Sequence, residues 1–307
     1  MKKIRLSEKR AGNKKLVMTI GVFDGVHIGH QEIISYIVKR AKRKDCLSCV
    51  LTFSPHPSDI VHPCRKVHML FSLAHRIEIL KRFGVDIVYV VNFNRRLASM
   101  DYERFAGRIL IKKLRLAEIV VGDNFNMGRD RKGNVLKLKH ILRQNNIKVK
   151  IINCKKYKGR TVSSTLIRKA LMSGNLRMAD HLLGRPFSIM GKVVHGDNRG
   201  REIGFKTANL DIDHEVLPPA GVYAVKVHMG SKVMDGIVNV GFRPTFKSIH
   251  DEPTVEVHIL GLNANIYGEN IEVIFRKKIR PEWHFSNKTR LYDQIVKDII
   301  KAKRVLS

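Results

Sequence analysis

Short apolar runs alternate with amphipathic segments through the first 184 residues of the chain. The strand-like runs fall at 16–20, 47–53, 86–93, 117–122 and 148–153. Apolar residues recur at helical spacing between them, near 31–42, 73–83, 101–114 and 134–145, and a helical pair follows near 165–172 and 176–183. This alternation predicts a doubly wound, Rossmann-like parallel sheet with helices on both faces. Gly184-Arg185-Pro186 predicts a boundary, so the first domain is expected to span 1–184.

The pattern changes after this boundary. Strand-like runs separated by Gly, Asn and Pro clusters occur at 187–195, 207–212, 221–229, 232–240, 254–260 and 271–279. Six short strands with little helix predict a small antiparallel β-barrel. The closing stretch 289–304 carries Leu291, Ile295 and Ile299 at helical spacing, which predicts a C-terminal helix. The second domain is therefore expected to span 185–307.

Composition narrows the class of protein without identifying it. A hydrophobic content of 44% and a mean hydropathy of −0.17 are typical of a soluble protein. No apolar stretch approaches the roughly 18 residues of a spanning helix, and the basic stretch 1–15 lacks the apolar segment of a signal peptide. We therefore expect a cytoplasmic protein without a membrane partner. The sequence leaves the number of chains in its assembly open.

The four cysteines are too few and too scattered for a disulfide framework. Cys46-x-x-Cys49 has the spacing of a zinc or redox site, but no second Cys/His pair matches it. The pair falls at an expected strand, where cysteine packs as a small apolar residue. We favour that structural interpretation.

The net charge of +31 raises the question of a polyanionic partner. Residues 1–184 carry 39 Lys and Arg against 13 Asp and Glu, whereas residues 185–307 carry 19 against 14. Such an excess suits nucleic acid, and a basic nucleic-acid-binding protein on a nucleotide-binding fold is one alternative. However, the basic residues are spread over expected helices and loops, without a stripe interleaved with aromatics. We favour a solvated basic surface that attracts anionic small molecules.

The turn between the first expected strand and helix carries the most specific chemistry. It reads Gly21-Val22-Phe23-Asp24-Gly25-Val26-His27-Ile28-Gly29-His30. Its glycines bend the chain and let a ligand approach the backbone. His27 and His30 fall where the helix begins, and unpaired backbone N–H groups at that end attract phosphate. The turn therefore predicts a nucleotide-handling site.

Three further clusters fall at expected strand ends of the first domain, at 53–57, 122–128 and 163–168. Ligands of an open parallel sheet bind beyond the carboxyl ends of its strands, so these clusters should meet the histidine turn in one cleft. Singly, each has a structural explanation: His56 lies between prolines in a rigid turn, and Ser163-Ser164-Thr165 could cap a helix. Their combination favours a site.

The histidine turn, Pro55-His56-Pro57 and Ser163-Ser164-Thr165-Leu166-Ile167-Arg168 together resemble the FMN adenylyltransferase module of bacterial bifunctional riboflavin kinase/FAD synthetases. The resemblance implies transfer of AMP from ATP to FMN, with release of pyrophosphate and with Mg²⁺ bridging phosphates. It implies catalytic roles for His27, His30 and Arg168 and flavin contacts for His56 and Asn124. The residues that it implies for ATP and phosphate are Gly21, Phe23, Asp24, Gly29, Ser163, Ser164 and Thr165.

The chemistry of this reaction fits such a site. The phosphate of FMN has a second pKa of about 6, so it is anionic near neutrality and needs no general base. The site must align the reactants and compensate charge on the attacked α-phosphate. The chain departs from the family at Val22, where the family most often has Asn.

The second domain also contains a glycine-rich pattern typical of phosphate-binding loops, with glycines at 196, 200 and 204. Alone this signal is weak, because hairpin turns also use glycine. Thr207-Ala208-Asn209, then Asn239 to Arg243 and Glu256, follow in an order that resembles the riboflavin kinase module of the same family. The resemblance implies phosphate contacts from Gly196, Gly200, Gly204, Thr207 and Asn209, with Mg²⁺ on the last two. It implies flavin contacts from Asn239 and Arg243.

The same resemblance makes Glu256 the base for the riboflavin 5′-hydroxyl, which is not ionised at pH 7. Without the motif, Glu256 would be assigned as a solvent-facing carboxylate of an alternating strand. Lys206 replaces the family's Pro before Thr207, and 261–268 lacks the family's acidic residues before Tyr267-Gly268.

We interpret the chain as a bifunctional enzyme that uses ATP to convert riboflavin to FMN and FMN to FAD. A close alternative is an FMN adenylyltransferase whose barrel has lost kinase activity.

Overall fold

The computed structural model describes residues 1–6, 13–64, 67–195, 204–213, 215–243 and 252–307. Contacts divide the chain into two compact units, Met1–His68 with Leu73–Ser164, and Met69–Ser72 with Thr165–Ser307. The helical pair 165–172 and 176–183, expected in the first domain, thus groups with the second unit. That the adenylyltransferase domain ends at residue 184 and the kinase domain begins at residue 185 stays a prediction.

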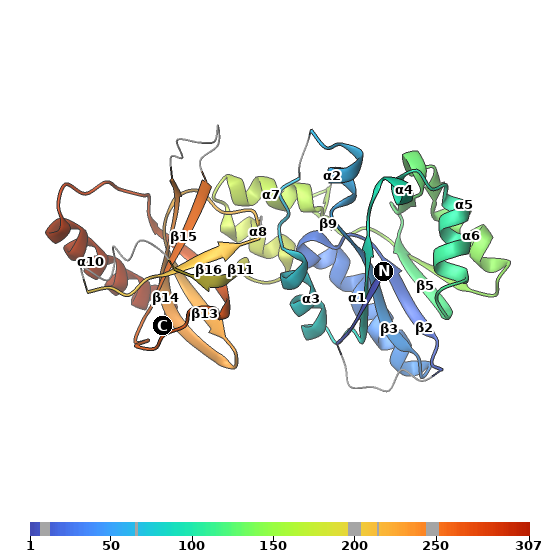
Figure 1. Cartoon of the computed structure of the whole chain (residues 1–307), viewed down its shortest axis with the longest axis horizontal. Helices are drawn as coiled ribbons and strands as arrows, with labels where there is room; N and C mark the ends of the chain where they lie inside the picture. The colour runs from blue at the N-terminus through green and yellow to red at the C-terminus, as the bar shows by residue number, and fades with distance from the viewer. Residues whose placement is uncertain (7–12, 65–66, 196–203, 214, 244–251) are drawn as a thin grey trace. The chain divides into compact units, whose positions relative to one another are not determined.

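The first unit is built on a six-stranded sheet (Figure 1). Its strands in chain order are β1 (Lys2–Arg5), β2 (Leu16–Ile20), β3 (Leu47–Ser54), β4 (Ile87–Asn92), β5 (Leu116–Gly122) and β8 (Lys148–Ile152). Their spatial order is β1-β4-β3-β2-β5-β8, with all neighbours parallel except the edge strand β1. From β2 the chain runs outward through β3 and β4, and then through β5 and β8 on the other side. This reversal makes the carboxyl ends of β2 and β5 the expected ligand crevice.

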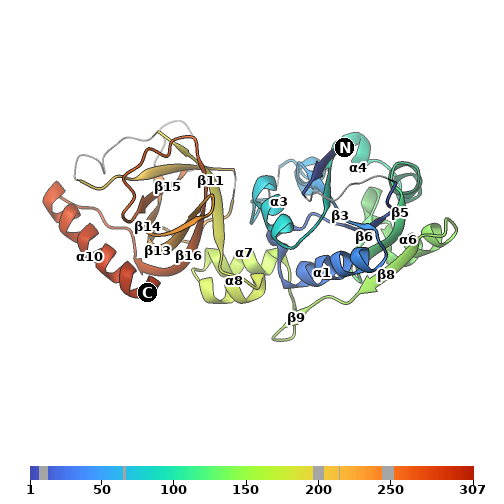
Figure 2. The same ribbon diagram turned by 90° about the horizontal axis from the view of Figure 1, so that it is seen from below.

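Helices cover the two faces of this sheet, as predicted. Alternate residues of β2, Leu16, Met18 and Ile20, pack in one core with α5 (Tyr102–Phe105), the π-helix η2 (Ala106–Ile111) and α6 (Val135–Arg143). The intervening Val17 and Thr19 face the other way, because strand side chains alternate. There α1 (Ile28–Arg43), which Figure 2 shows alongside the strands, contacts β2, β3 and β5 through its buried Ile34 and Ile37.

The remaining elements of the first unit are short, apart from α3 (Leu73–Arg82). They are α2 (Pro57–Val61), α4 (Arg95–Ala98), η1 (Asp24–Val26), η3 (Arg129–Arg131), the pair β6 (Asn126–Met127) and β7 (Gly133–Asn134), and the pair β9 (Lys156–Tyr157) and β10 (Arg160–Thr161). The hydrophobic pattern of the sequence does not predict these short elements, β1 or the π-helical geometry of η2. It did predict α1, α3, α6 and the five parallel strands within a few residues.

The second unit contains a closed barrel in the order β11-β12-β15-β14-β13-β16. Its strands are β11 (Ser188–Val194), β12 (Ala208–Ile212), β13 (Gly221–Met229), β14 (Lys232–Arg243), β15 (Glu252–Ile259) and β16 (Asn270–Arg280). All neighbouring pairs are antiparallel. The expected six-stranded antiparallel barrel is therefore confirmed.

In the described part of the second unit, the barrel is accompanied by α7 (Ser164–Met172, of which Ser164 groups with the first unit), α8 (Leu176–Leu183) and α10 (Lys288–Leu306). The helix α10 buries Ala302 and Leu306 against Val222, Ala224 and Ile237 of the barrel. It thereby covers the outer face of β13 and β14 and confirms the predicted closing helix. The helix α8 ends at Gly184, which has a φ of 68°, a left-handed conformation that suits glycine.

The segment Met69–Ser72 belongs to the second unit although it precedes α3. The backbone N–H of Ser72 donates to the carboxylate of Glu215 at 2.8 Å, and Val216 donates its N–H to the carbonyl of Met69 at 2.9 Å. The buried ring of Phe71 stacks on Phe187 with centroids 6.1 Å apart. These contacts explain why Met69–Ser72 groups with the second unit although residues of the first unit flank it on both sides in the sequence.

Of the two cysteines expected in a strand, Cys49 lies in β3, whereas Cys46 immediately precedes that strand. Cys49 is fully buried in β3 within the core of the sheet, and all four cysteines are unpaired. Among the residues that the structure describes, no three His, Cys, Asp or Glu side chains gather as a metal site. In that same part of the chain, no helix is both long and apolar enough to cross a membrane.

Candidate active sites

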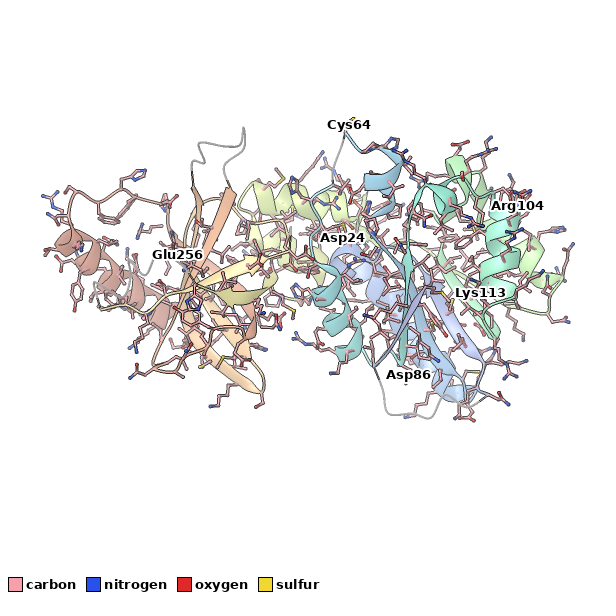
Figure 3. The ribbon with its side chains drawn as sticks, in the orientation of Figure 1. Asp24, Cys64, Asp86, Arg104, Lys113 and Glu256 are labelled. Atoms are coloured by element: carbon pink, nitrogen blue, oxygen red, sulfur yellow. The ribbon has the colours of Figure 1, made fainter. Side chains whose placement is uncertain are left out.

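The histidine turn leaves the carboxyl end of β2 in a compact and partly strained conformation. Phe23 and Val26 have φ angles of 55° and 40°, and Gly25 has a φ of 82°. Positive φ is unfavourable for a β-branched residue such as Val26, and this kind of strain concentrates at functional sites. Val26 is fully buried and Asp24 nearly so, which holds the turn in this shape. Figure 3 labels Asp24 at this end of the sheet and Asp86 at the opposite end.

The two histidines of the turn form a stacked pair at the start of α1. Their ring centroids are 3.6 Å apart and their planes differ by 17°. His27 is the N-cap of α1, and its Nδ1 accepts the backbone N–H of His30 at 3.4 Å. The ring of Phe23 meets His30 edge-on at 5.0 Å. The prediction that both histidines lie at the helix N-terminus is therefore confirmed.

Two glycines of the turn provide space around aromatic rings. A Cβ on Gly29 would lie 3.3 Å from Nδ1 and Cε1 of His27, and one on Gly21 would lie 3.1 Å from the Phe23 ring. Both distances are shorter than ordinary contacts, so any larger residue would displace a ring. These glycines position the histidine pair through packing, whereas Gly25 supplies the left-handed backbone.

Hydrogen bonds to backbone carbonyls fix the turn from outside. The Val22 carbonyl accepts the Thr52 hydroxyl at 3.1 Å and a guanidinium N–H of the buried Arg76 from α3. The Ser164 hydroxyl donates to the Asp24 carbonyl at 2.9 Å, which brings the predicted Ser164 to the turn. Val22 therefore anchors the turn through its backbone carbonyl.

Arg76 is a site residue that the sequence analysis missed. Its signal was a His75-Arg76 pair in helical register with the buried Ile79 and Leu80. A cation in the buried stripe of an amphipathic helix indicates an internal acceptor, because a buried charge needs compensation. Here the acceptor is the backbone beside the histidines.

The carboxyl end of β5 carries a second polar turn at the same edge of the sheet. A Cβ on Gly122 would lie 3.1 Å from the Oδ1 atom of Asn124, closer than an ordinary contact. Asp123 accepts the Cys154 backbone N–H at 3.2 Å and the Cys154 thiol at 2.7 Å. These bonds lower the pKa of Asp123 and join the ends of β5 and β8 next to Asn124. Asn124 itself is exposed, and its contact with flavin stays a prediction.

His56 has a clear local role at the end of β3. It is the N-cap of α2, and its Nδ1 accepts the Ser58 backbone N–H at 3.0 Å. The neutral ring therefore carries its proton on Nε2. This geometry agrees with the rigid-turn explanation, and contact with flavin stays a prediction.

Ser163 is half-buried, whereas Thr165 is exposed and Arg168 half-buried on α7. From Thr165 onward α7 belongs to the second unit. The convergence of Thr165 and Arg168 on the histidines stays a prediction.

The barrel brings three of its predicted site residues into one row. Glu256 of β15 lies directly opposite Asn209 of β12 on one side and Asn239 of β14 on the other. All three are half-buried, while their neighbours Val255, Val257 and Val238 are buried inside the barrel. Side chains directly opposite in antiparallel strands lie about 5 Å apart on the same face. A carboxylate flanked by two amides thus faces outward from the barrel wall, where Figure 3 labels Glu256.

The segment before β12 carries the other predicted phosphate residues. Gly204 has a φ of 83° and no atom near its missing Cβ, and the half-buried Thr207 immediately precedes Ala208. Gly196 and Gly200 lie outside the described residues. Arg243 ends β14, and its side chain lies outside the described part as well.

Comparison with known proteins assigns both units. A family model described as FAD synthetase matches residues 9–166, and one described as riboflavin kinase matches residues 183–306. The bifunctional riboflavin kinase/FMN adenylyltransferase of Buchnera aphidicola subsp. Schizaphis graminum is 39% identical, covering 95% of this chain and 94% of that protein. The Escherichia coli K12 enzyme of the same name is 37% identical, covering 96% and 94% respectively.

A solved structure shares the fold over nearly the whole chain. It is a crystal structure described as a macrolide-efflux protein from Streptococcus pneumoniae, 31% identical, with a TM-score of 0.81 and 97% of both chains covered. The family matches favour the flavin enzyme over the nucleic-acid-binding alternative. They cover the riboflavin kinase domain as well as the FAD synthetase domain. The chain belongs to the family of bifunctional riboflavin kinase/FMN adenylyltransferases, transferases that use ATP to phosphorylate riboflavin to FMN and to adenylylate FMN to FAD.

Proposed function

We propose that the two reactions of this enzyme are centred on two separate sets of residues, one in each unit. The stacked His27 and His30 serve the adenylyl transfer, and Glu256 with its flanking amides serves the phosphoryl transfer. The observation that carries this proposal is the gathering of each set inside its own unit. The histidine pair lies at a helix N-terminus, and the carboxylate lies between Asn209 and Asn239 on the barrel.

In adenylyl transfer, a phosphate oxygen of FMN attacks the α-phosphorus of ATP. A P–O bond forms to FMN, and the bond between the α-phosphorus and the pyrophosphate oxygen breaks. Because the attacking phosphate is already anionic, no residue has to remove a proton. His27, His30 and the N–H groups at the start of α1 stabilise the charge on the α-phosphate.

Several other residues support this step in our proposal. Ser163, Ser164, Thr165 and Arg168 bind the phosphates of ATP, together with the backbone of Gly21, Phe23, Asp24 and Gly29. His56 and Asn124 contact the flavin at the ends of β3 and β5. The support for Ser164 is its hydrogen bond to the Asp24 carbonyl of the histidine turn. The support for Asn124 is its exposed position just after β5, where the order of the strands reverses.

In phosphoryl transfer, the 5′-oxygen of riboflavin attacks the γ-phosphorus of ATP, and ADP leaves. The Glu256 carboxylate accepts the proton of the hydroxyl as the new P–O bond forms. Asn239 and Arg243 contact the flavin, and Asn209 and Thr207 face the phosphates. The register supports this assignment, because Glu256 lies opposite Asn209 on one side and Asn239 on the other.

The residues beside Glu256 also suit Mg²⁺. The Thr207 hydroxyl and the Asn209 side-chain carbonyl are neutral oxygen donors, and Mg²⁺ prefers oxygen ligands while retaining waters and phosphate contacts. No cluster of three acidic or histidine side chains occurs among the described residues, which agrees with a metal held largely by the nucleotide. When bound, Mg²⁺ supplies positive charge to the transferring phosphates. We propose Thr207 and Asn209 as its protein ligands.

We also propose that the enzyme works in the cytoplasm on small-molecule substrates. Both reactions require ATP, and the four unpaired cysteines suit a reducing compartment.

Separate assays of the two reactions test the proposed function. The full chain is incubated with ATP and Mg²⁺ and either riboflavin or FMN, and the flavins are resolved by chromatography. We expect FMN and FAD from riboflavin, and FAD from FMN. FAD from FMN without any FMN from riboflavin would support the alternative of an impaired kinase, which rests on Lys206 beside Thr207.

A further inference from the structure

One end of the barrel contains a cavity of about 370 Å³. Its floor is formed by aliphatic side chains of β11, β12 and β15, and its wall by the segment 262–267. Thr207 lies on its rim, two residues from Asn209 in the proposed catalytic row. A ligand bound in this cavity would therefore lie next to Thr207, a proposed phosphate-binding residue.

Lys206 is the one charged side chain among the described residues that line this cavity. Its ammonium donates to the Oδ1 atom of Asn263 on the opposite wall at 2.5 Å. The ion pairs of the described residues include none with Lys206. The cation is thus held by a neutral amide, a weaker partner than an anionic oxygen.

The backbone around Lys206 is fixed independently of its ammonium. Its carbonyl accepts the Nδ1–H of His258 at 2.8 Å, and the neighbouring Phe205 packs edge-on against the His258 ring at 5.5 Å. The ring of Tyr292 from α10 lies 5.3 Å from Phe205. The side chain of Lys206 can therefore change partners while the segment that carries Thr207 stays in place.

We propose that Lys206 is a phosphate-binding residue of the kinase, and that its ammonium exchanges Asn263 for phosphate oxygens of a nucleoside triphosphate in the cavity. The aliphatic floor, the amide groups of the wall and the single cation at the rim suit a ligand with a flat heterocycle and an anionic end. The two stretches of the second domain at which the sequence departs from the family pattern, Lys206 and 261–268, meet at this hydrogen bond. The inference rests on the proposed kinase function of the barrel.

The test compares Lys206→Met, which keeps the aliphatic stem, with Lys206→Arg, which keeps the charge. Initial rates of FMN formation are measured against ATP concentration at saturating riboflavin, at low and at moderate salt. Lys206→Met should raise the KM for ATP on the order of tenfold, because a charge-assisted hydrogen bond is lost. It should leave kcat within about twofold and flatten the salt dependence of KM. Lys206→Arg should recover most of the affinity.

Two further measurements make the outcome decisive. Lys226→Met removes a lysine that pairs with Asp235 elsewhere on the barrel and should leave the KM for ATP unchanged. FAD formation from FMN by the same proteins reports whether the first unit is intact, and thermal unfolding followed by the fluorescence of Trp283 in the second unit reports whether the barrel of each variant is folded. Equal KM values in wild type and Lys206→Met would overturn the inference, as would a loss of kcat shared by Lys206→Met and Lys206→Arg. A wild type that makes no FMN would instead overturn the proposed kinase function.

Discussion

The imidazoles of His27 and His30 lie parallel, with centroids 3.6 Å apart, at the first turn of α1. Because the rings stack on one another, each fixes the position of its partner. The ring nitrogens and the first backbone N–H groups of the helix are therefore held in a fixed arrangement relative to one another. This arrangement provides preorganised charge stabilisation for a phosphate.

His30→Ala should remove FAD formation and spare FMN formation. Loss of one preorganised group lowers the rate on the order of 10²-fold to 10³-fold. Both activities are measured on the same full-length protein by chromatography of the flavins. His140→Ala, on the exposed side of α6, is the matched control and should retain both activities. Equal loss of FMN and FAD formation in His30→Ala would contradict two independent sites.

Gly29→Ala should lower the rate of FAD formation without lowering the stability of the protein. The new Cβ would lie 3.3 Å from the His27 ring, which would have to shift by a few tenths of an ångström within the stack, so we expect FAD formation to fall about tenfold. Alanine is also the better helix former, by roughly 0.5–1 kcal/mol, so the helix itself should not weaken. Steady-state kinetics and thermal unfolding check the two effects. Gly107→Ala, where no atom lies near the new Cβ, should leave the rate of FAD formation unaltered.

Glu256→Gln should abolish most FMN formation while FAD formation from supplied FMN continues. The amide has nearly the shape of the carboxylate but cannot accept the hydroxyl proton, and general-base catalysis contributes about 10²-fold to 10⁴-fold. The assay follows FMN from riboflavin under saturating ATP. Asp235→Asn changes a carboxylate of β14 that pairs with Lys226 and serves as the control. Undiminished FMN production would remove Glu256 from its proposed role.

The sequence predicted the elements whose burial follows a simple period. Residues Leu16 to Ile20 are buried throughout, as expected for a central parallel strand, and Val255, Val257 and Ile259 alternate with outward residues in the barrel. The edge strand β1 was missed because Lys2 and Lys3 do not form an apolar run. It is held by pairing with β4.

The site contacts that the sequence missed join residues far apart in the chain. Arg76 meets Val22 across 54 positions, and Cys154 meets Asp123 across 31. Local motifs contain no information on such pairs, because tertiary packing alone brings them together. The row of Asn209, Glu256 and Asn239 likewise depends on strand register, although each residue was singled out by its own motif.

Cys154 should be slow to alkylate until Asp123 is changed. Burial, and then the neighbouring Asp123 carboxylate, raise the pKa of the Cys154 thiol to about 11. At pH 8 its thiolate fraction is on the order of 100-fold below that of an ordinary cysteine. In Asp123→Asn the repulsion disappears, so reaction with iodoacetamide should accelerate about tenfold while burial still protects the thiol. Peptide mass spectrometry follows the rate.

The exposed Cys64 provides an internal standard for that experiment, since it is remote from Asp123 in sequence and its reactivity should not change. Identical alkylation rates of Cys154 in both proteins would show that the carboxylate does not control the thiol.

Glu118 of β5 should stabilise the first unit in a pH-dependent way. It is buried and accepts hydrogen bonds from Tyr36 of α1 at 3.1 Å, from Arg40 of α1 at 3.0 Å and from Lys44, the C-cap of that helix, at 2.8 Å. Burial raises the pKa of Glu118, but these three bonds together outweigh it and leave the pKa below the ordinary value. Removing the charge by Glu118→Gln should therefore destabilise the unit, by about 1–3 kcal/mol at pH 7.

A carboxyl with a lowered pKa in the folded state stabilises fully above its unfolded pKa of about 4.3, and this contribution is lost as pH falls through the folded pKa. The difference between wild type and Glu118→Gln should thus be constant from pH 7 to about pH 5 and shrink below pH 4. Hydrogen exchange of peptides from α1 and β5 measures it, because the one tryptophan, Trp283, lies in the second unit. Asp45→Asn, in an exposed pair with Lys14, should change stability by less than about 0.5 kcal/mol. A Glu118→Gln effect that persists undiminished at pH 3 would mean that the ion pairs are not its origin.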